Sequence, residues 1–138
     1  MERKDLTEIF METAVLFSQR STCMRKQVGA FIVKDKRIIS TGYNGALPSD
    51  PHCSSDICDL TQHCKRAIHA ECNALLFAGR SGISVIGADL YVTVSPCKKC
   101  SEMIILSGII NVFYKEKYRE GDEAMALLNQ HNIKSFLK

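Results

Sequence analysis

The stretch HAECNALLFAGRSGISVIGADLYVTVSPCKKC, residues 69–100, decides the fold of this chain. Small and apolar side chains dominate its first part and the residues just before it, which predicts a buried helix over 66–78. Alternating apolar residues predict a strand over 88–94. Pro96 suits the start of a further helix, ending near residue 107, because its missing N–H costs nothing there. The stretch therefore predicts helix, strand and helix, with potential metal ligands at both helix starts.

Three groups that favour zinc lie at the two ends of this stretch: the imidazole of His69 and the thiols of Cys97 and Cys100. Residues i and i+3 share a helix face, so both thiols can reach one metal ion. The positive end of a helix also favours the thiolate form. Three protein ligands leave the fourth tetrahedral position open, as in catalytic zinc sites. Glu71 is the expected catalytic group, acting as base and then as acid.

The cysteine pair taken alone leaves two other interpretations open. A C-x-x-C motif is also typical of redox-active thiols and of half a structural zinc site. The His-Ala-Glu motif at residues 69–71, together with the lack of a second C-x-x-C pair, favours a catalytic zinc.

The composition fits an ordinary globular protein. The 138 residues are 46% apolar and 24% charged, which suits one domain over 1–138. A net charge of +3 is too small to indicate nucleic-acid binding, although it would suit a phosphorylated substrate. There is no signal-peptide core after Met1 and no apolar run of the roughly 18 residues that a membrane helix needs. Seven cysteines, an odd number, favour the reducing cytoplasm over a disulfide framework.

The rest of the chain completes an α/β fold. Apolar residues at helical spacing predict a helix that packs on the core over 5–18. Asn44 and Gly45 are expected to turn the chain sharply, because Asn-Gly favours positive φ. Together the elements predict a three-layer αβα sandwich, with a mixed five-stranded sheet and helices on both faces. The other predicted elements are strands over 28–33, 37–43, 109–115 and 133–137 and a helix over 123–130.

A long loop over residues 46–63 precedes the opening stretch. Loops of this length usually have a function or an internal cross-link. Four thiols on or beside it could hold a second, structural zinc ion, with His63 as a substitute ligand. The alternative is free thiols, since buried cysteine is common. The four are Cys23, Cys53, Cys58 and Cys64.

Several motifs resemble those of the deoxycytidylate (dCMP) deaminases of phage and bacterial type, within the zinc-dependent cytidine/deoxycytidylate deaminase superfamily. The order H-x-E and then P-C-x-x-C is the zinc-deaminase signature. Gly-Tyr-Asn-Gly and His-Ala-Glu-x-Asn-Ala are the motifs that resemble dCMP deaminases rather than enzymes acting on a free base or tRNA. The matching segments cover nearly all of residues 21–118 and are 27–30, 42–45, 69–74, 90–93, 95–100 and 107–109.

The resemblance implies an activity and an assembly. It implies that dCMP and water give dUMP and ammonia, which supplies dUMP for dTMP synthesis. It also implies a homohexamer that dCTP activates and dTTP inhibits.

The same resemblance implies individual roles. His69, Cys97 and Cys100 resemble the zinc ligands and Glu71 the proton carrier. The substrate-binding residues would be Asn73, which resembles a sugar contact, Ser95, and Tyr118, which resembles a phosphate contact. The effector nucleotide would lie at Gly42, Tyr43, Asn44, Gly45 and Arg80.

Simpler interpretations remain open for several of these residues. Asn73 could only form hydrogen bonds beside its helix, residues 42–45 could be only a tight turn, and Tyr118 could be an exposed aromatic. Two other functions also remain. One is a deaminase of tRNA adenosine or another base, which the lack of a basic stripe disfavours. The other is a non-catalytic zinc module like the competence-associated members of the family, which the intact Glu71 disfavours.

Overall fold

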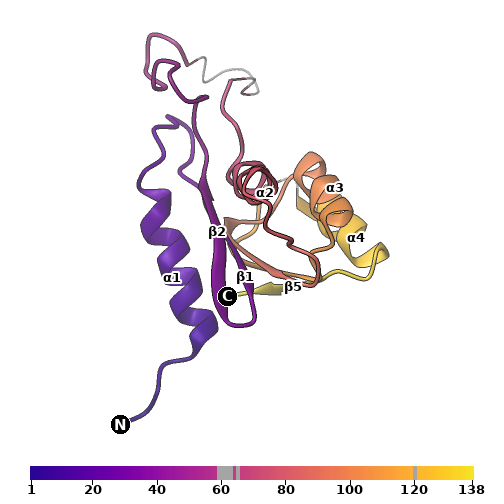
Figure 1. The fold of residues 1–138 in the computed structure, drawn as a ribbon. Coiled ribbons are helices and arrows are strands. Elements are labelled where there is room, and N and C mark those ends of the chain that lie inside the picture. The colour runs from indigo at the N-terminus through magenta and orange to yellow at the C-terminus, as the bar shows by residue number, and fades with distance from the viewer. Residues whose placement is uncertain (59–63, 65, 120) are drawn as a thin grey trace.

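The chain forms a mixed five-stranded sheet between two layers of helices (Figure 1). A computed structural model describes residues 1–58, 64, 66–119 and 121–138. The strands are β1 (Gly29–Lys34), β2 (Arg37–Tyr43), β3 (Asp89–Val94), β4 (Asn111–Glu116) and β5 (Lys134–Leu137). Their order across the sheet is β2-β1-β3-β4-β5. Strand β1 pairs antiparallel with both β2 and β3. The pairs β3–β4 and β4–β5 are parallel. The predicted mixed sheet is confirmed.

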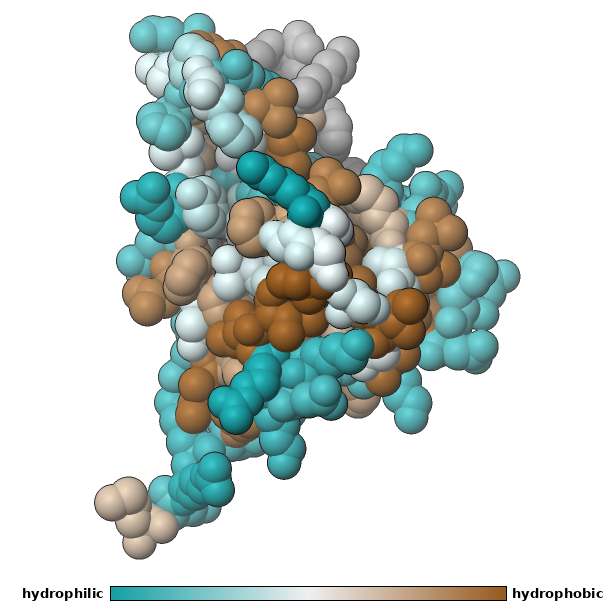
Figure 2. Space-filling model, viewed as in Figure 1, coloured by the Kyte–Doolittle hydropathy of each residue, from teal (hydrophilic) through white to brown (hydrophobic). Residues whose placement is uncertain are grey.

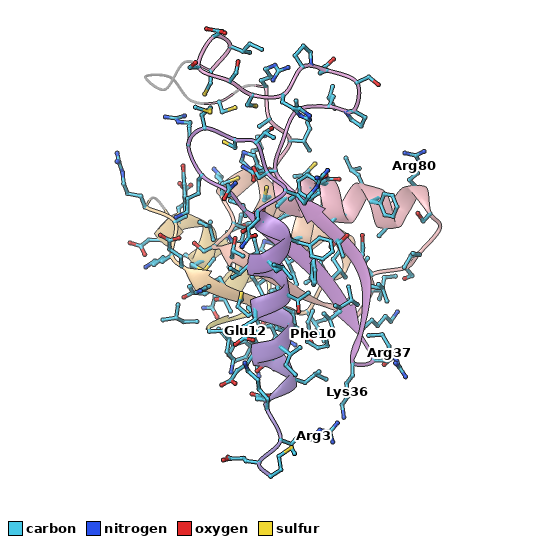
Figure 3. All side chains as sticks on the ribbon, turned by 90° about the vertical axis from the view of Figure 1, so that its left-hand side faces the viewer. Arg3, Phe10, Glu12, Lys36, Arg37 and Arg80 are labelled. Carbon is cyan, nitrogen blue, oxygen red and sulfur yellow. The ribbon has the colours of Figure 1, made fainter. Side chains whose placement is uncertain are left out.

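One helix covers one face of the sheet. This helix, α1 (Leu6–Ser18), has Asp5 as its N-cap, and the Asp5 carboxylate accepts a hydrogen bond from the Thr7 N–H. Its buried residues pack on Phe31 and Val33 of β1 and on Tyr91 of β3. Figure 3 shows the labelled Phe10 beside the sheet. The helix expected over 5–18 is confirmed within one residue.

Three helices cover the other face. They are α2 (Ala70–Arg80), α3 (Lys98–Ser107) and α4 (Gly121–Gln130). The alternate residues of β1, Ala30 and Ile32, join their apolar core, as the period of two along a strand requires. The αβα sandwich is therefore confirmed as the fold (Figure 1).

Both site helices begin later than expected. The helix predicted from residue 66 begins at Ala70, because Ile68 forms a β-bridge with Gly45 and His69 is extended as the N-cap. Pro96 precedes the N-cap of α3, which is Cys97, rather than starting the helix. These shifts place the imidazole and one thiol at the entrances of two neighbouring helices.

The sharp turn expected at Asn44 and Gly45 is wrong. Neither residue has a positive φ. Asn44 accepts a hydrogen bond from the Val28 N–H and donates one to the Lys26 carbonyl, both at 2.8 Å. After β2 the chain is therefore held by these bonds and by the bridge from Gly45 to Ile68.

Candidate metal centre and active site

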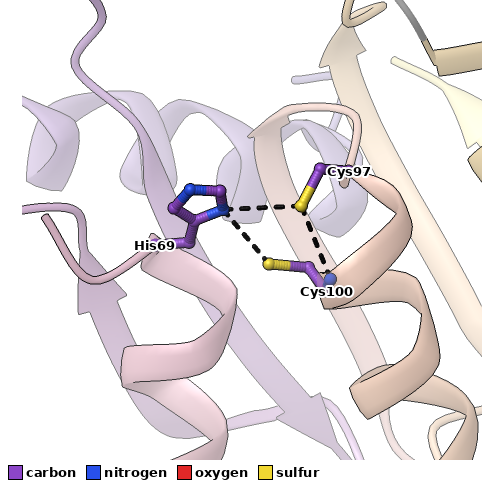
Figure 4. A group of neighbouring side chains, drawn as sticks. All are labelled: His69, Cys97 and Cys100. Atoms are coloured by element: carbon purple, nitrogen blue, oxygen red, sulfur yellow. Dashed lines mark hydrogen bonds between the residues drawn. The ribbon is translucent and has the colours of Figure 1, made fainter. Parts of the chain in front are cut away.

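Three side chains converge where α2 and α3 begin. The Nδ1 of His69 lies 3.5 Å from the Sγ of Cys97 and 3.3 Å from the Sγ of Cys100 (Figure 4). All three ligand atoms lie within 4.8 Å of one another. Tetrahedral zinc ligands of these types lie about 3.6 Å apart, given their bond lengths. One nitrogen and two sulfurs at this spacing fit a zinc ion with an open fourth position.

The two thiols differ in their protonation. The thiol of Cys100 donates a hydrogen bond to Cys97, and this bond is the main cause that lowers the pKa of Cys97 to about 4. Sharing that proton raises the pKa of Cys100. The hydrogen bond with Cys97 raises the pKa of His69. The group therefore contains one thiolate, Cys97, which hydrogen bonds from Cys100 and His69 stabilise. A bound cation would stabilise the same negative charge.

Glu71 lies in the first turn of α2 and is only 4% exposed. Burial raises the pKa of its carboxyl to about 7. A carboxyl with this pKa can both accept and donate a proton near neutral pH, which suits a general base that later acts as an acid.

A cavity of about 470 Å³ opens on this group. Its size suits a small-molecule ligand. His69, Glu71 and Cys97 line it, with Val28 and Val94 as apolar neighbours. A second cavity of about 460 Å³ borders the same ligands from the α3 side.

The comparisons with known proteins agree with this geometry. Residues 4–116 match the family described as the cytidine and deoxycytidylate deaminase zinc-binding region. The chain belongs to this deaminase family. It is 42% identical over 134 residues to ComE operon protein 2 of Bacillus subtilis, covering 96% of this chain and 71% of that protein. It is 42% identical over 129 residues to the deoxycytidylate deaminase of Mycobacterium phage D29, covering 85% and 99%.

A solved structure supports the same family assignment. The dCMP deaminase of cyanophage S-TIM5, in complex with dCMP and dUMP, superposes with a TM-score of 0.87. The two chains are 36% identical, and the match covers 98% of each. No helix in the described part of this deaminase is long and apolar enough to cross a membrane.

The predicted substrate residues do not all reach the main cavity. Ser95 and Tyr118 both line it, and they are joined by a hydrogen bond from the Tyr118 N–H to the Ser95 Oγ. Asn73 lies outside the lining and donates a hydrogen bond to the Tyr43 carbonyl at 3.0 Å. Its sugar contact and the other substrate roles stay predictions.

The predicted effector residues lie on two different elements: residues 42–45 at and just beyond the end of β2, and Arg80 at the end of α2. Gly42 packs on the start of α2, where an added Cβ would lie 2.5 Å from the Ala70 carbonyl oxygen. Arg80 ends the same helix, about 15 Å away at 1.5 Å per residue, and Figure 3 shows it pointing outward. The ring of Tyr43 lies 6.0 Å from the Arg20 guanidinium. Residues 42–45 and Arg80 thus do not lie together in one described pocket, and the effector site stays a prediction.

Asn44, expected in the effector segment, instead lines the main cavity. Arg25, Lys26 and Arg119 also line it, and of these three the sequence motifs did not point to Arg119. Arg119 follows the predicted Tyr118 directly, which was the one signal that could have suggested it.

The loop cysteines approach one another without forming a compact ligand set. Burial raises the pKa of Cys58, and so do the nearby Cys23, Cys64 and Cys53 thiols. The Sγ of Cys64 accepts a hydrogen bond from the Ala67 N–H at 3.4 Å. Among the described residues, only His69, Cys97 and Cys100 come within 4.8 Å as a set. His63 lies outside the described residues, so the second zinc stays a prediction.

Proposed function

We propose that this chain catalyses the hydrolytic deamination of dCMP to dUMP and ammonia. The observation that carries the proposal is the buried Glu71 carboxyl beside the His69, Cys97 and Cys100 group, inside a cavity of small-molecule size. The relatives from phage D29 and phage S-TIM5 support the choice of dCMP as substrate.

In this proposal His69, Cys97 and Cys100 would hold the catalytic zinc. When bound, zinc supplies the polarisation that lets water act as a nucleophile near pH 7. Glu71 removes a proton from water as its oxygen bonds to C4 of cytosine, and Glu71 gives that proton to ring atom N3. Glu71 then carries the hydroxyl proton to the amino nitrogen, and the C4–N bond breaks to release ammonia. A pKa of about 7 suits both directions of transfer.

The experiment is a substrate panel with the zinc-loaded chain, following ammonia release. The panel contains dCMP, dCTP, cytidine, deoxycytidine and a tRNA anticodon stem-loop. Turnover of dCMP above all other substrates is the expected result. Preferred turnover of the stem-loop would instead establish a nucleic-acid deaminase, and no turnover of any substrate would favour a non-catalytic zinc module.

We also propose a second, structural zinc ion held by Cys23, Cys53, Cys58 and Cys64. Two observations support it: the other three thiols lie near enough to Cys58 to raise its pKa, and the N–H of Ala67 is directed at the Sγ of Cys64. Backbone N–H groups of this kind stabilise thiolate ligands. Cys23 and Cys64 also line the main cavity, so this ion would fix part of the active-site border.

Self-association and nucleotide control form the last part of the proposal. Leu76 and Phe77 of α2 are 65% and 52% exposed, and Figure 2 shows hydrophobic areas on the molecular surface. Such patches favour contacts between subunits, which supports self-association; the homohexamer follows from the family resemblance. Control by dCTP and dTTP, and supply of dUMP for dTMP synthesis in the cytoplasm, follow from the family resemblance. Light scattering measures the assembly, and dCMP turnover with each triphosphate measures the control.

A further inference from the structure

A row of aromatic residues crosses the sheet on the face that α1 covers. In the strand register Phe31 of β1 lies opposite Tyr91 of β3. Phe113 of β4 comes next in the row, and Phe136 of β5 is the last. The rings of Tyr91 and Phe113 are stacked with centroids 4.6 Å apart, and those of Phe113 and Phe136 are stacked at 4.9 Å. The row therefore runs from β1 to the outermost strand, β5.

The helical cover over this row ends before β5. Phe17 of α1 contacts the ring of Phe31 edge to face, with centroids 5.0 Å apart. Phe10 of the same helix contacts Tyr91 in the same way at 5.3 Å. Phe31 is 1% exposed, whereas Phe136 is 39% exposed. In the described part of the chain α1 is the one helix on this face, so the Phe136 ring is open to a further apolar or aromatic group.

The β5 edge, residues 134–138, also offers free backbone groups. Among the described residues, no strand pairs with β5 on the side away from β4. The N–H groups of Lys134 and Lys138 donate to β4-side carbonyls, at 3.4 and 2.7 Å. Because backbone groups alternate in direction along a strand, the N–H and C=O groups of Ser135 and Leu137 point to the open side. An open edge of this kind can take up one more strand.

Two lysines flank the exposed ring. Lys134 and Lys138 lie two residues before and after Phe136, so the period of two places all three side chains on one face. Both lysines are exposed, and no carboxylate of the described residues forms an ion pair with either. Asp5 is near Lys138: its pKa is lowered by hydrogen bonds from Thr7 first and by the Lys138 charge in addition. The β5 edge therefore presents an apolar ring between two cations.

Charge decides which strand fits the β5 edge. An antiparallel β5 of a second copy, centred on Phe136, would place Lys134 of each copy directly opposite Lys138 of the other. Like charges that lie directly opposite each other destabilise a strand pair, and opposite charges stabilise it. The edge is therefore complementary to a strand with acidic residues two positions before and after an apolar residue.

We propose that the β5 edge binds an extended acidic segment of a partner protein, which adds a sixth strand to the sheet. An aromatic or apolar residue of the segment packs on Phe136, and its acidic residues lie opposite Lys134 and Lys138. The N–H of Phe136 faces β4, so an antiparallel guest forms a non-hydrogen-bonded pair with Phe136, in which side chains approach closely. The inference is independent of the proposed deamination, because no residue of the β5 edge lines either cavity beside the metal group.

The experiment measures the binding of two fluorescent peptides by anisotropy: Gly-Glu-Val-Phe-Val-Glu-Gly and the same peptide with both Glu replaced by Lys. The wild-type chain should bind the acidic peptide about ten-fold more tightly, from two favourable cross-strand charge pairs. The double variant Lys134→Glu/Lys138→Glu should reverse this preference. Lys36→Glu/Arg37→Glu is the matched control: it makes the same charge change at the start of β2, the opposite edge of the sheet, and should keep the wild-type preference.

Ser135→Pro tests the strand pairing itself. Proline removes an N–H that points to the open side, so the β4–β5 pairing should persist and the acidic peptide should bind about five-fold more weakly. Urea unfolding checks that the variant folds, and the charge-reversal pair decides the inference if it does not. Equal binding of both peptides, or binding of neither, would overturn the inference.

Two other occupants of the β5 edge are tested with the same variants. A smaller assembly of Ser135→Pro than of the wild-type chain, measured by light scattering without peptide, would assign the edge to a second copy and overturn the inference. A single-stranded oligonucleotide that binds more tightly than the acidic peptide, and loses affinity in Lys134→Glu/Lys138→Glu, would overturn it in favour of a base-stacking surface.

Discussion

The hydroxyl oxygen of Ser95 accepts a hydrogen bond from the backbone N–H of Tyr118 at 2.6 Å. This bond ties the end of β3 to the segment after β4, so two strands of the parallel part of the sheet jointly hold one border of the cavity. Ligands of α/β folds bind at the carboxyl ends of parallel strands, and this is the edge concerned. The buried Ser95 hydroxyl is therefore one of the groups that position Tyr118, together with the Gly121 N–H that donates to the Tyr118 carbonyl.

Ser95→Ala should lower the free energy of unfolding by about 1–3 kcal/mol, because it leaves the Tyr118 N–H without its partner. It should also lower kcat/KM for dCMP. Urea unfolding and steady-state kinetics measure the two effects. Ser101→Ala is the matched control, since the Ser101 hydroxyl is buried and has no hydrogen-bond partner among the described residues. That variant should be neutral or slightly stabilising, and an equal loss in both variants would contradict the role given to the Ser95 bond.

Glu71→Gln should lower kcat for dCMP by about 10²–10⁴-fold, the usual contribution of a general acid–base group. The amide keeps the size of the carboxyl but cannot accept and return a proton. Zinc content, measured by metal analysis, should match the wild-type chain, because Glu71 is not among the three ligating side chains. A variant that keeps both zinc and near wild-type turnover would contradict the proposed mechanism.

The pKa of Glu71 predicts a pH effect on stability in the zinc-free chain. Burial raises this pKa from 4.5 to about 7, so the folded chain retains a proton that the unfolded chain releases. The stabilising contribution is complete below about pH 4.5 and disappears as pH rises through about 7. The difference in unfolding free energy between wild type and Glu71→Gln should therefore fall by about 3 kcal/mol between pH 4 and pH 8, at about 1.4 kcal/mol per pH unit. A pH-independent difference would mean that Glu71 has the same pKa in the folded and unfolded chains, and would contradict a pKa raised by burial.

Local sequence signals predicted the metal group well. The spacing of Cys97 and Cys100 places both thiols in one helix turn, whatever the rest of the chain does. Apolar alternation gave the core strands, because Ala30 and Ile32 face one helix layer while Phe31 and Val33 face the other. These features depend on neighbours in sequence, and the sequence displays them directly.

Long-range contacts explain where the structure differs from the sequence-based predictions. The bridge between Ile68 and Gly45 delays the start of α2, and helical propensity alone does not reveal it. Asn44 has no positive φ, and its side chain binds the backbone at residues 26 and 28, far back in the chain. The same bonds carry Asn44 to the cavity. A turn propensity could not predict a residue whose partners come from the segment before β1.

Metal analysis tests the second zinc. The wild-type chain should contain two zinc ions, and Cys58→Ser should contain one while keeping the catalytic ion and part of the dCMP turnover. The melting temperature should fall in this variant, since structural zinc contributes folding free energy. Cys72→Ser is the matched control, because Cys72 lies beside the second cavity and outside both proposed ligand sets. One zinc per wild-type chain would exclude the structural ion.

Alanine substitutions at Gly42 and Gly45 test whether Gly42 is required for packing or for effector binding. Gly42→Ala should cost about 1–3 kcal/mol of unfolding free energy, because the new Cβ would lie 2.5 Å from the Ala70 carbonyl oxygen and 2.7 Å from the Ala74 N. Gly45→Ala adds a Cβ with no atom within 4 Å and should change stability little. Urea unfolding without nucleotide measures both. If Gly42→Ala unfolds like the wild type and loses only its response to dCTP, the close approach of β2 to α2 is not what requires glycine there, and the effector role is favoured instead.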